Sequence, residues 1–130
     1  MEDASTTAPA LDEAQRIIER LINKRRPANF SAEDDEEEFI HFLALIKQNI
    51  GLRAHFIEIF TKMLRAEKPA PYHLIAFCMH ELQWPEIEQV ALDAMKHGHP
   101  RNFSLASETA EAYECEEWFG RLVFPYYKSK

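Results

Sequence analysis

The sequence predicts an all-α protein, an irregular bundle of about five to seven helices, and three observations support this fold class. Apolar residues recur every three or four positions along most of the chain, which is the spacing of one helical face. No segment alternates apolar and polar residues with a period of two, as half-buried strands do. Residues that favour helices are abundant, whereas only 3 of the 130 residues are glycine.

The first half of the chain predicts three helices. The first spans residues 11–25, with acids in its first turn and bases at its end, as the helix dipole favours. Ser31 is a suitable N-cap for a second helix, with Asp34 in place of the usual capping-box partner, and Gly51 is the natural end of that helix. A third helix follows over residues 52–66, before a linker with two prolines.

The middle of the chain predicts the centre of the fold. Residues 71–82 are apolar on almost every side, so we expect this helix to be covered by its neighbours. A fifth helix over residues 85–97 begins with Pro85, which suits a first helical turn, and ends at Gly98, where we expect a left-handed cap. Trp84, between the two helices, is expected to pack inside.

The last third of the chain gives weaker signals. Ser104 or Ser107 is a candidate cap for a helix that reaches about residue 114, and residues 116–124 form a candidate for another. The aromatic tail that ends in Tyr126 and Tyr127 is expected to dock on the body, because exposed aromatic surface is unfavourable in water.

Composition and charge indicate the domain organisation, the partners and the location that we expect. Residues 1–10 are small and polar and predict a disordered N-terminal tail, followed by a single helical domain over residues 11–130. Fifteen Lys and Arg against 22 Asp and Glu give a formal net charge of −7, so we expect no nucleic-acid partner. No apolar run is long enough to span a membrane and no signal peptide is evident, so we expect no membrane association and a cytoplasmic location.

Residues 72–97 resemble a helical hairpin of the HEAT-like repeat proteins. The corner is Trp84-Pro85-Glu86-Ile87, and Val90, Ala91 and Ala94 form the face of the returning helix. The resemblance implies an antiparallel helix pair in a scaffold that binds partners through an exposed helical face. It implies no catalytic residues.

An acidic run is the strongest local anomaly in the sequence, and its members are candidate partner-binding residues: Glu33, Asp34, Asp35, Glu36, Glu37 and Glu38. These acids fit the positive N-terminal end of a helix dipole. They also fit an electrostatic contact with a basic protein, which would relieve their mutual repulsion. Tyr126 and Tyr127 are the other candidates, because the aromatic tail is either docked or an interface.

The histidines and cysteines do not match a common metal motif. His73 and His80 are seven residues apart, too far along a helix to share one ion unaided, and His97 and His99 flank a glycine. Cys78 has apolar neighbours, which raise a thiol's pKa rather than activate it. We therefore expect no cofactor, no metal and no catalysis. A disulfide between Cys78 and Cys115 stays open.

The sequence favours a small α-helical interaction protein that binds a protein partner, and the acidic run favours a basic one. Two alternatives remain. The first is an immunity-type inhibitor that uses the acidic run to bind a basic toxin or nuclease. The second is a metal-binding protein or enzyme that uses the histidines and Cys78. The oligomeric state and the partner are left open.

Overall fold

The computed structural model is all-helical, which confirms the predicted fold class, and it describes residues 2–24, 32–98, 103–114, 118 and 120–128. The described elements are α1 (Glu2–Asn23), η1 (Ala32–Asp35), α2 (Glu36–Gln48), η2 (Ile50–Leu52), α3 (Arg53–Leu64), α4 (Leu74–Leu82), α5 (Pro85–His97), α6 (Phe103–Ala112), α7 (Gly120–Val123) and α8 (Pro125–Lys128). Over these residues no strand is present. None of the helices described combines the length and the apolar character that crossing a lipid bilayer requires.

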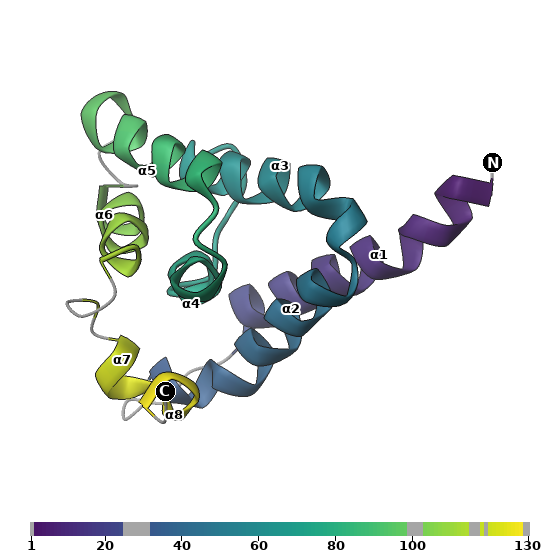
Figure 1. Ribbon diagram of the computed structural model, residues 1–130, viewed down its shortest axis with the longest axis horizontal. Helices are drawn as coiled ribbons and strands as arrows, with labels where there is room; N and C mark the ends of the chain where they lie inside the picture. Colours follow the sequence, from purple (N-terminus) through teal and green to yellow (C-terminus); the bar gives the residue numbers. More distant parts are fainter. Residues whose placement is uncertain (1, 25–31, 99–102, 115–117, 119, 129–130) are drawn as a thin grey trace.

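Helix α4 forms the centre of the molecule, as its apolar sequence predicts. Figure 1 looks along its axis and shows the other helices arranged around it. Its residues from Leu74 to His80 are all buried, and it packs against α2 and α6. The core continues from α4 through an aromatic cluster in which Phe77 contacts Phe39 of α2 and Phe124 near the C-terminus.

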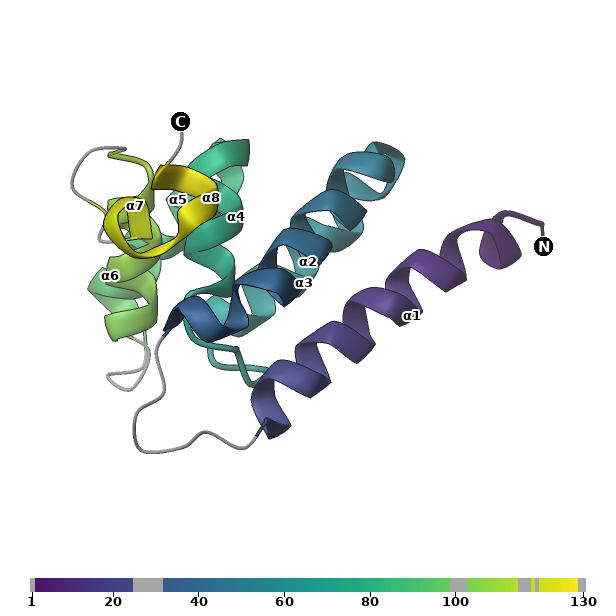
Figure 2. The same ribbon diagram turned by 90° about the horizontal axis from the view of Figure 1, so that it is seen from below.

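Helix α1 lies beside α2, and its N-terminal end projects beyond the body (Figure 2). Its buried face consists of Ala14, Ile17, Ile18 and Leu21. The helix begins at Glu2, well before the predicted start at Leu11, and includes Pro9, which removes one helical hydrogen bond. Residues 2–10 thus have a helical backbone rather than the irregular one of a tail. The division of the chain into a tail and one domain stays a prediction.

The second predicted helix begins differently from the expectation. Residues 32–35 form the 3-10 helix η1, and α2 itself starts at Glu36. The predicted N-cap, Ser31, lies outside the described residues. The predicted break near Gly51 is present as η2, which separates α2 from α3.

Helix α5 has the predicted bounds, but its axis is not aligned with that of α4. In Figure 1, α4 is seen end-on while α5 runs across the view, so the two helices cross steeply. Helix α5 packs against α6 and α3. Membership of the HEAT-like family stays a prediction. Trp84 at the corner is 6% exposed, as expected, and the Arg53 guanidinium lies over its ring at 4.9 Å.

Gly98 corrects a predicted conformation. Its φ of −81° and ψ of 178° are extended, not left-handed. Its N–H donates to the carbonyl of Ala94 at 2.8 Å, and a Cβ at Gly98 would lie 2.4 Å from that same oxygen. Close approach to the backbone is therefore the reason for glycine here.

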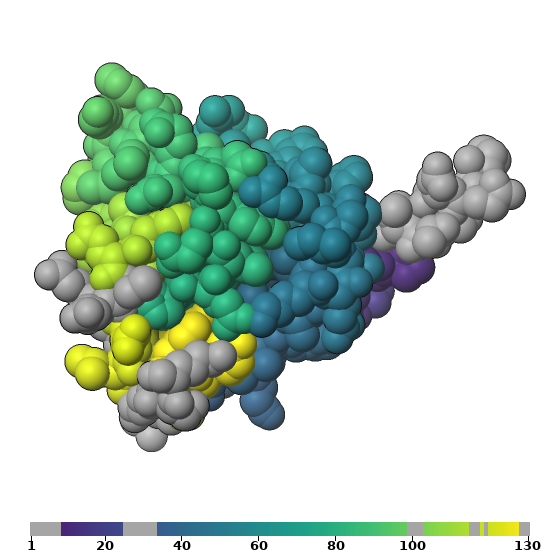
Figure 3. Space-filling view, in the orientation of Figure 1, coloured from purple at the N-terminus to yellow at the C-terminus, as the bar shows by residue number. Residues whose placement is uncertain are grey.

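The C-terminal segment docks on the body, as predicted from its aromatic content. Phe124 and Tyr127 are buried, and the Tyr127 ring lies 5.0 Å from that of Phe77. Figure 3 shows this segment, in yellow, packed against the rest of the molecule. The helix predicted over residues 116–124 is described only as α7, because residues 115–117 and 119 lie outside the described part.

Candidate partner-binding site

Two members of the acidic run, Asp35 and Glu38, pair with cations of the same chain. Asp35 is 3% exposed, and its Oδ1 accepts a hydrogen bond from Lys24 Nζ at 2.9 Å. Glu38 accepts a hydrogen bond from Arg20 Nε at 3.1 Å and lies 3.5 Å from Lys24 Nζ. The hydrogen bond to Asp35 raises the pKa of Lys24. The C-terminal end of α1 therefore relieves part of the repulsion among these acids.

The other members of the run differ in exposure. Asp34 and Glu37 have exposed side chains, Glu36 is half-buried, and the side chain of Glu33 lies outside the described part of the chain. Asp34 and Glu37 are thus the members that a basic partner can reach. Their role in binding stays a prediction.

The structure brings the two groups of predicted site residues together at the C-terminus. Glu36 Oε2 accepts the backbone N–H of Tyr126 at 2.7 Å, in the first turn of α8. The Tyr126 hydroxyl donates to Glu81 Oε1 at 2.7 Å, and the Tyr127 hydroxyl donates to the carbonyl of Phe77. Burial raises the pKa of both phenols. Both tyrosines therefore anchor α8 on the body, and Tyr127, at 4% exposed, belongs to the core.

The histidines and Cys78 occupy separate environments. The ring of His80 is buried, and its Nδ1–H donates to the carbonyl of Ala112 at 2.8 Å; burial lowers the pKa of this imidazole. Cys78 is a buried free thiol whose pKa is raised by burial. His97 is exposed, and His99 lies outside the described residues. Across the described residues, no group of three or more His, Cys, Asp or Glu side chains is placed to hold a metal ion.

His73 has a role that the sequence does not indicate. Its φ of 72° is left-handed, and its carbonyl accepts the N–H of Phe77 at 2.9 Å, so His73 is the N-cap of α4. Its side chain does not cap the helix. Instead Nδ1 lies 2.6 Å from Oε2 of Glu108 in α6, and the indole N–H of Trp118 lies 3.4 Å from the same oxygen. The pair therefore ties the start of α4 to α6.

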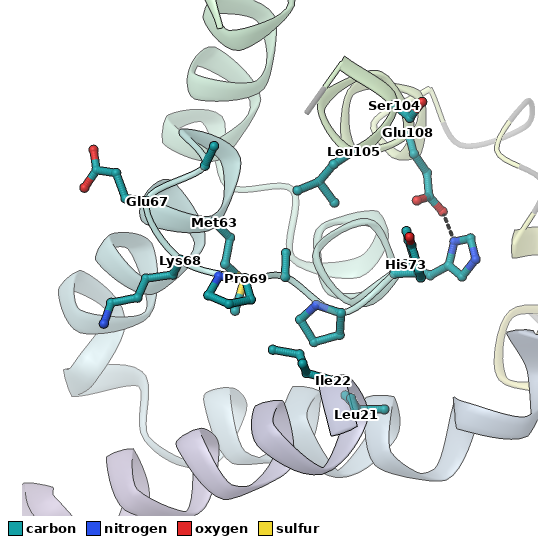
Figure 4. Close-up of a pocket in the computed structure, with 14 residues that line it drawn as sticks. Leu21, Ile22, Met63, Glu67, Lys68, Pro69, His73, Ser104, Leu105 and Glu108 are labelled. Atoms are coloured by element: carbon teal, nitrogen blue, oxygen red, sulfur yellow. Dashed lines mark hydrogen bonds and ion pairs between the residues drawn. The ribbon is translucent and has the colours of Figure 1, made fainter. Parts of the chain in front are cut away.

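The His73–Glu108 pair stands at the edge of an open hollow of about 680 Å³ (Figure 4). Helices α1, α3 and α6 and residues 66–73 enclose it. Its apolar lining includes Leu21, Ile22, Met63, Ala70, Pro71 and Leu105. Its polar lining includes Glu67, Lys68, His73, Ser104 and Glu108.

A second groove of about 530 Å³ lies next to the hollow, between α1 and α3. The two share Ile22, Met63, Lys68 and Pro69 as lining residues. The groove adds an apolar lining from Leu11, Ile18 and Ile59. We call the hollow and the groove together the trough.

The edge of the trough carries exposed apolar side chains. Ile22 is 37% exposed and Tyr72 is 76% exposed, and both line the hollow. Phe103, which is 50% exposed, precedes the lining residue Ser104. Sequence analysis missed this surface, because its residues come from four separate segments. The only signal in the sequence is that the apolar stripe of α1 is wider than a single packing partner needs.

The fold and the trough define a class of protein: a helical domain with an open apolar surface between helices. Comparison of the chain with models of protein families, with curated proteins and with solved structures finds no match.

Proposed function

We propose that this chain is a helical protein-interaction module and that the trough is the surface on which its partner binds. The observation that carries the proposal is that the hollow and the groove lie next to each other and share four lining residues. Both are open and are lined partly by apolar residues of α1, and a surface of this kind suits an amphipathic helix.

The exposed side chains at the edge support a docking surface. Ile22 and Tyr72 keep apolar area in contact with water, and covering such area on binding is favourable by about 25 cal/mol per Å² before the costs of association. Exposed apolar patches with polar borders are typical of interaction sites. Here the border is polar: Gln15, Glu19 and His55 line the groove.

Site-specific photo-cross-linking in the source cells tests this function. A photoreactive amino acid at Ile22 reports on the trough, and the same residue at Leu122 is the matched control. Leu122 is also an exposed apolar residue, at 77%, but it lies on α7, away from the trough.

We expect a discrete covalent adduct with a protein from position 22 and not from position 122. The adduct should disappear when Tyr72 on the same edge is replaced by Ser. Equal adducts from both positions, or none from position 22, would show that the trough is not an interface.

A further inference from the structure

Among the described residues, one oxygen of the Glu108 carboxylate is approached by hydrogen-bond donors and the other is not. Both the Nδ1 of His73 and the indole N–H of Trp118 approach Oε2. Within the described part of the chain, no residue hydrogen-bonds Oε1. The side chain is 16% exposed and lines the hollow, so the carboxylate is largely buried and borders the trough.

The charge at this end of the hollow is negative. Figure 4 shows Glu108 and His73 facing each other on one side, whereas Lys68 extends in the opposite direction. The other lysine of the trough, Lys62, lies in the groove and pairs with Glu58 at 3.3 Å. Neither lysine that lines the described trough is therefore paired with Glu108.

We infer that the partner segment carries a Lys or Arg side chain next to its apolar stripe, and that this cation binds Glu108 while the apolar residues fill the hollow. The inference rests on the proposed function and adds the chemistry of the partner. Tyr72 supports it, because an exposed phenol ring on the same hollow offers a face to a cation.

A protein segment fits better than a small organic cation. The hollow is open, so a small ligand at Glu108 would leave most of its surface in water, whereas ligand pockets bury most of it. An amphipathic helix can follow the whole trough and place one basic residue at the α6 end.

Binding of three fluorescent helical peptides tests the inference. All three carry the same leucine stripe, and they differ only in having Lys, Gln or Glu beside it. Fluorescence anisotropy with the full chain should show that the Lys peptide binds about fivefold more tightly than the Gln peptide, and the Glu peptide most weakly. Higher salt should reduce the difference, because screening weakens the ion pair.

The variant Glu108→Gln should abolish the preference for Lys while keeping binding through the stripe. A glutamine oxygen can still accept from His73, and far-UV circular dichroism checks that the fold persists. The matched control is Glu111→Gln, which removes the same charge from an exposed position of α6 outside the trough. It should leave the preference intact.

Several results would overturn the inference: equal binding of the three peptides, an equal effect of both variants, or no binding of any peptide. Binding of n-butylammonium as tight as that of the Lys peptide would favour a small cation instead. None of these results refutes the proposed function, because cross-linking from Ile22 tests that function separately, with the natural partner. The two can therefore fail separately.

Discussion

The end of α3 allows a direct test of how this glycine-poor chain makes its turns. Ala66 has a φ of 66°, which is left-handed. Its N–H donates to the carbonyl of Met63 at 3.1 Å, and the N–H of Glu67 donates to the carbonyl of Lys62 at 2.8 Å. These two bonds form a Schellman motif, in which the left-handed residue is usually glycine.

Replacing Ala66 with glycine is expected to raise the free energy of unfolding. A Cβ in the left-handed region costs about 1–2 kcal/mol. The greater freedom of glycine in the unfolded chain offsets about 0.4–1 kcal/mol of that gain. The net stabilisation is therefore about 0.5–1 kcal/mol. With an unfolding entropy of about 2.1 cal/mol/K per residue over 130 residues, the melting temperature should rise by about 3 °C.

The matched control is Ala54→Gly, the same substitution at an exposed position in the helical part of α3. It should lower stability by about 0.5–1 kcal/mol, because glycine is the poorer helix former. Urea unfolding followed by far-UV circular dichroism measures both variants. If both lose the same stability, the conformation of Ala66 carries no strain and the reasoning is refuted.

Three further predictions concern the core. Tyr127→Phe should lower stability by about 1 kcal/mol, because its hydroxyl donates to a carbonyl of α4, whereas Tyr72→Phe, at a 76% exposed side chain, should change nothing. An equal effect of both would contradict this. Burial lowers the pKa of His80, so the unfolded chain gains a proton first as the pH falls below about 6.5, and stability should decrease there. The variant His80→Asn keeps a hydrogen-bond donor toward α6, so its urea midpoint should decrease less than that of the original chain as the pH falls. If the midpoint decreases equally in both, another group causes the loss of stability. Burial also raises the pKa of the Cys78 thiol, so in a Cys115→Ser background a maleimide should label only denatured protein. Rapid labelling of the native protein would show that the thiol is accessible.

Features encoded by neighbouring residues could be predicted from the sequence. Pro85 and the end of the apolar pattern fixed the bounds of α5, and the apolar sequence of α4 predicted its central place. Both signals act within a few residues: proline favours a first turn, and a helix that is apolar all round must be covered.

Left-handed conformations at residues other than glycine could not be predicted. His73 adopts a left-handed φ and contacts Glu108, which is 35 residues away in the sequence. Gln83 also has a left-handed φ, of 55°, and its side-chain amide donates to the carbonyls of Met79 and His80 in the last turn of α4. These hydrogen bonds offset backbone strain of about 1–3 kcal/mol per residue. Glycine is therefore a poor guide to the turns of this chain.

Part of the negative charge of the acidic run is balanced by cations of the same chain. Six consecutive acids repel one another, so they require a nearby cation. Sequence analysis considered a helix dipole and a basic partner as the source of positive charge, whereas the structure places Lys24 and Arg20 of α1 beside Asp35 and Glu38. The cations and the acids belong to different helical segments whose relative placement the sequence does not define, so the pairing could not be anticipated.

The trough could not be predicted for the same reason: the sequence does not show which segments come to lie beside an apolar face. Periodicity predicts that α1 has a buried face, but it does not say how far the neighbours cover that face. Leu21 is fully buried, whereas Ile22, the next residue, is 37% exposed and lines the trough. The difference depends on where α3 ends and where residues 66–73 pass, because these segments form the opposite wall. When the apolar stripe of a helix is wider than its neighbours can cover, part of the stripe stays exposed. An exposed apolar edge with polar groups around it is a surface on which a second protein can bind.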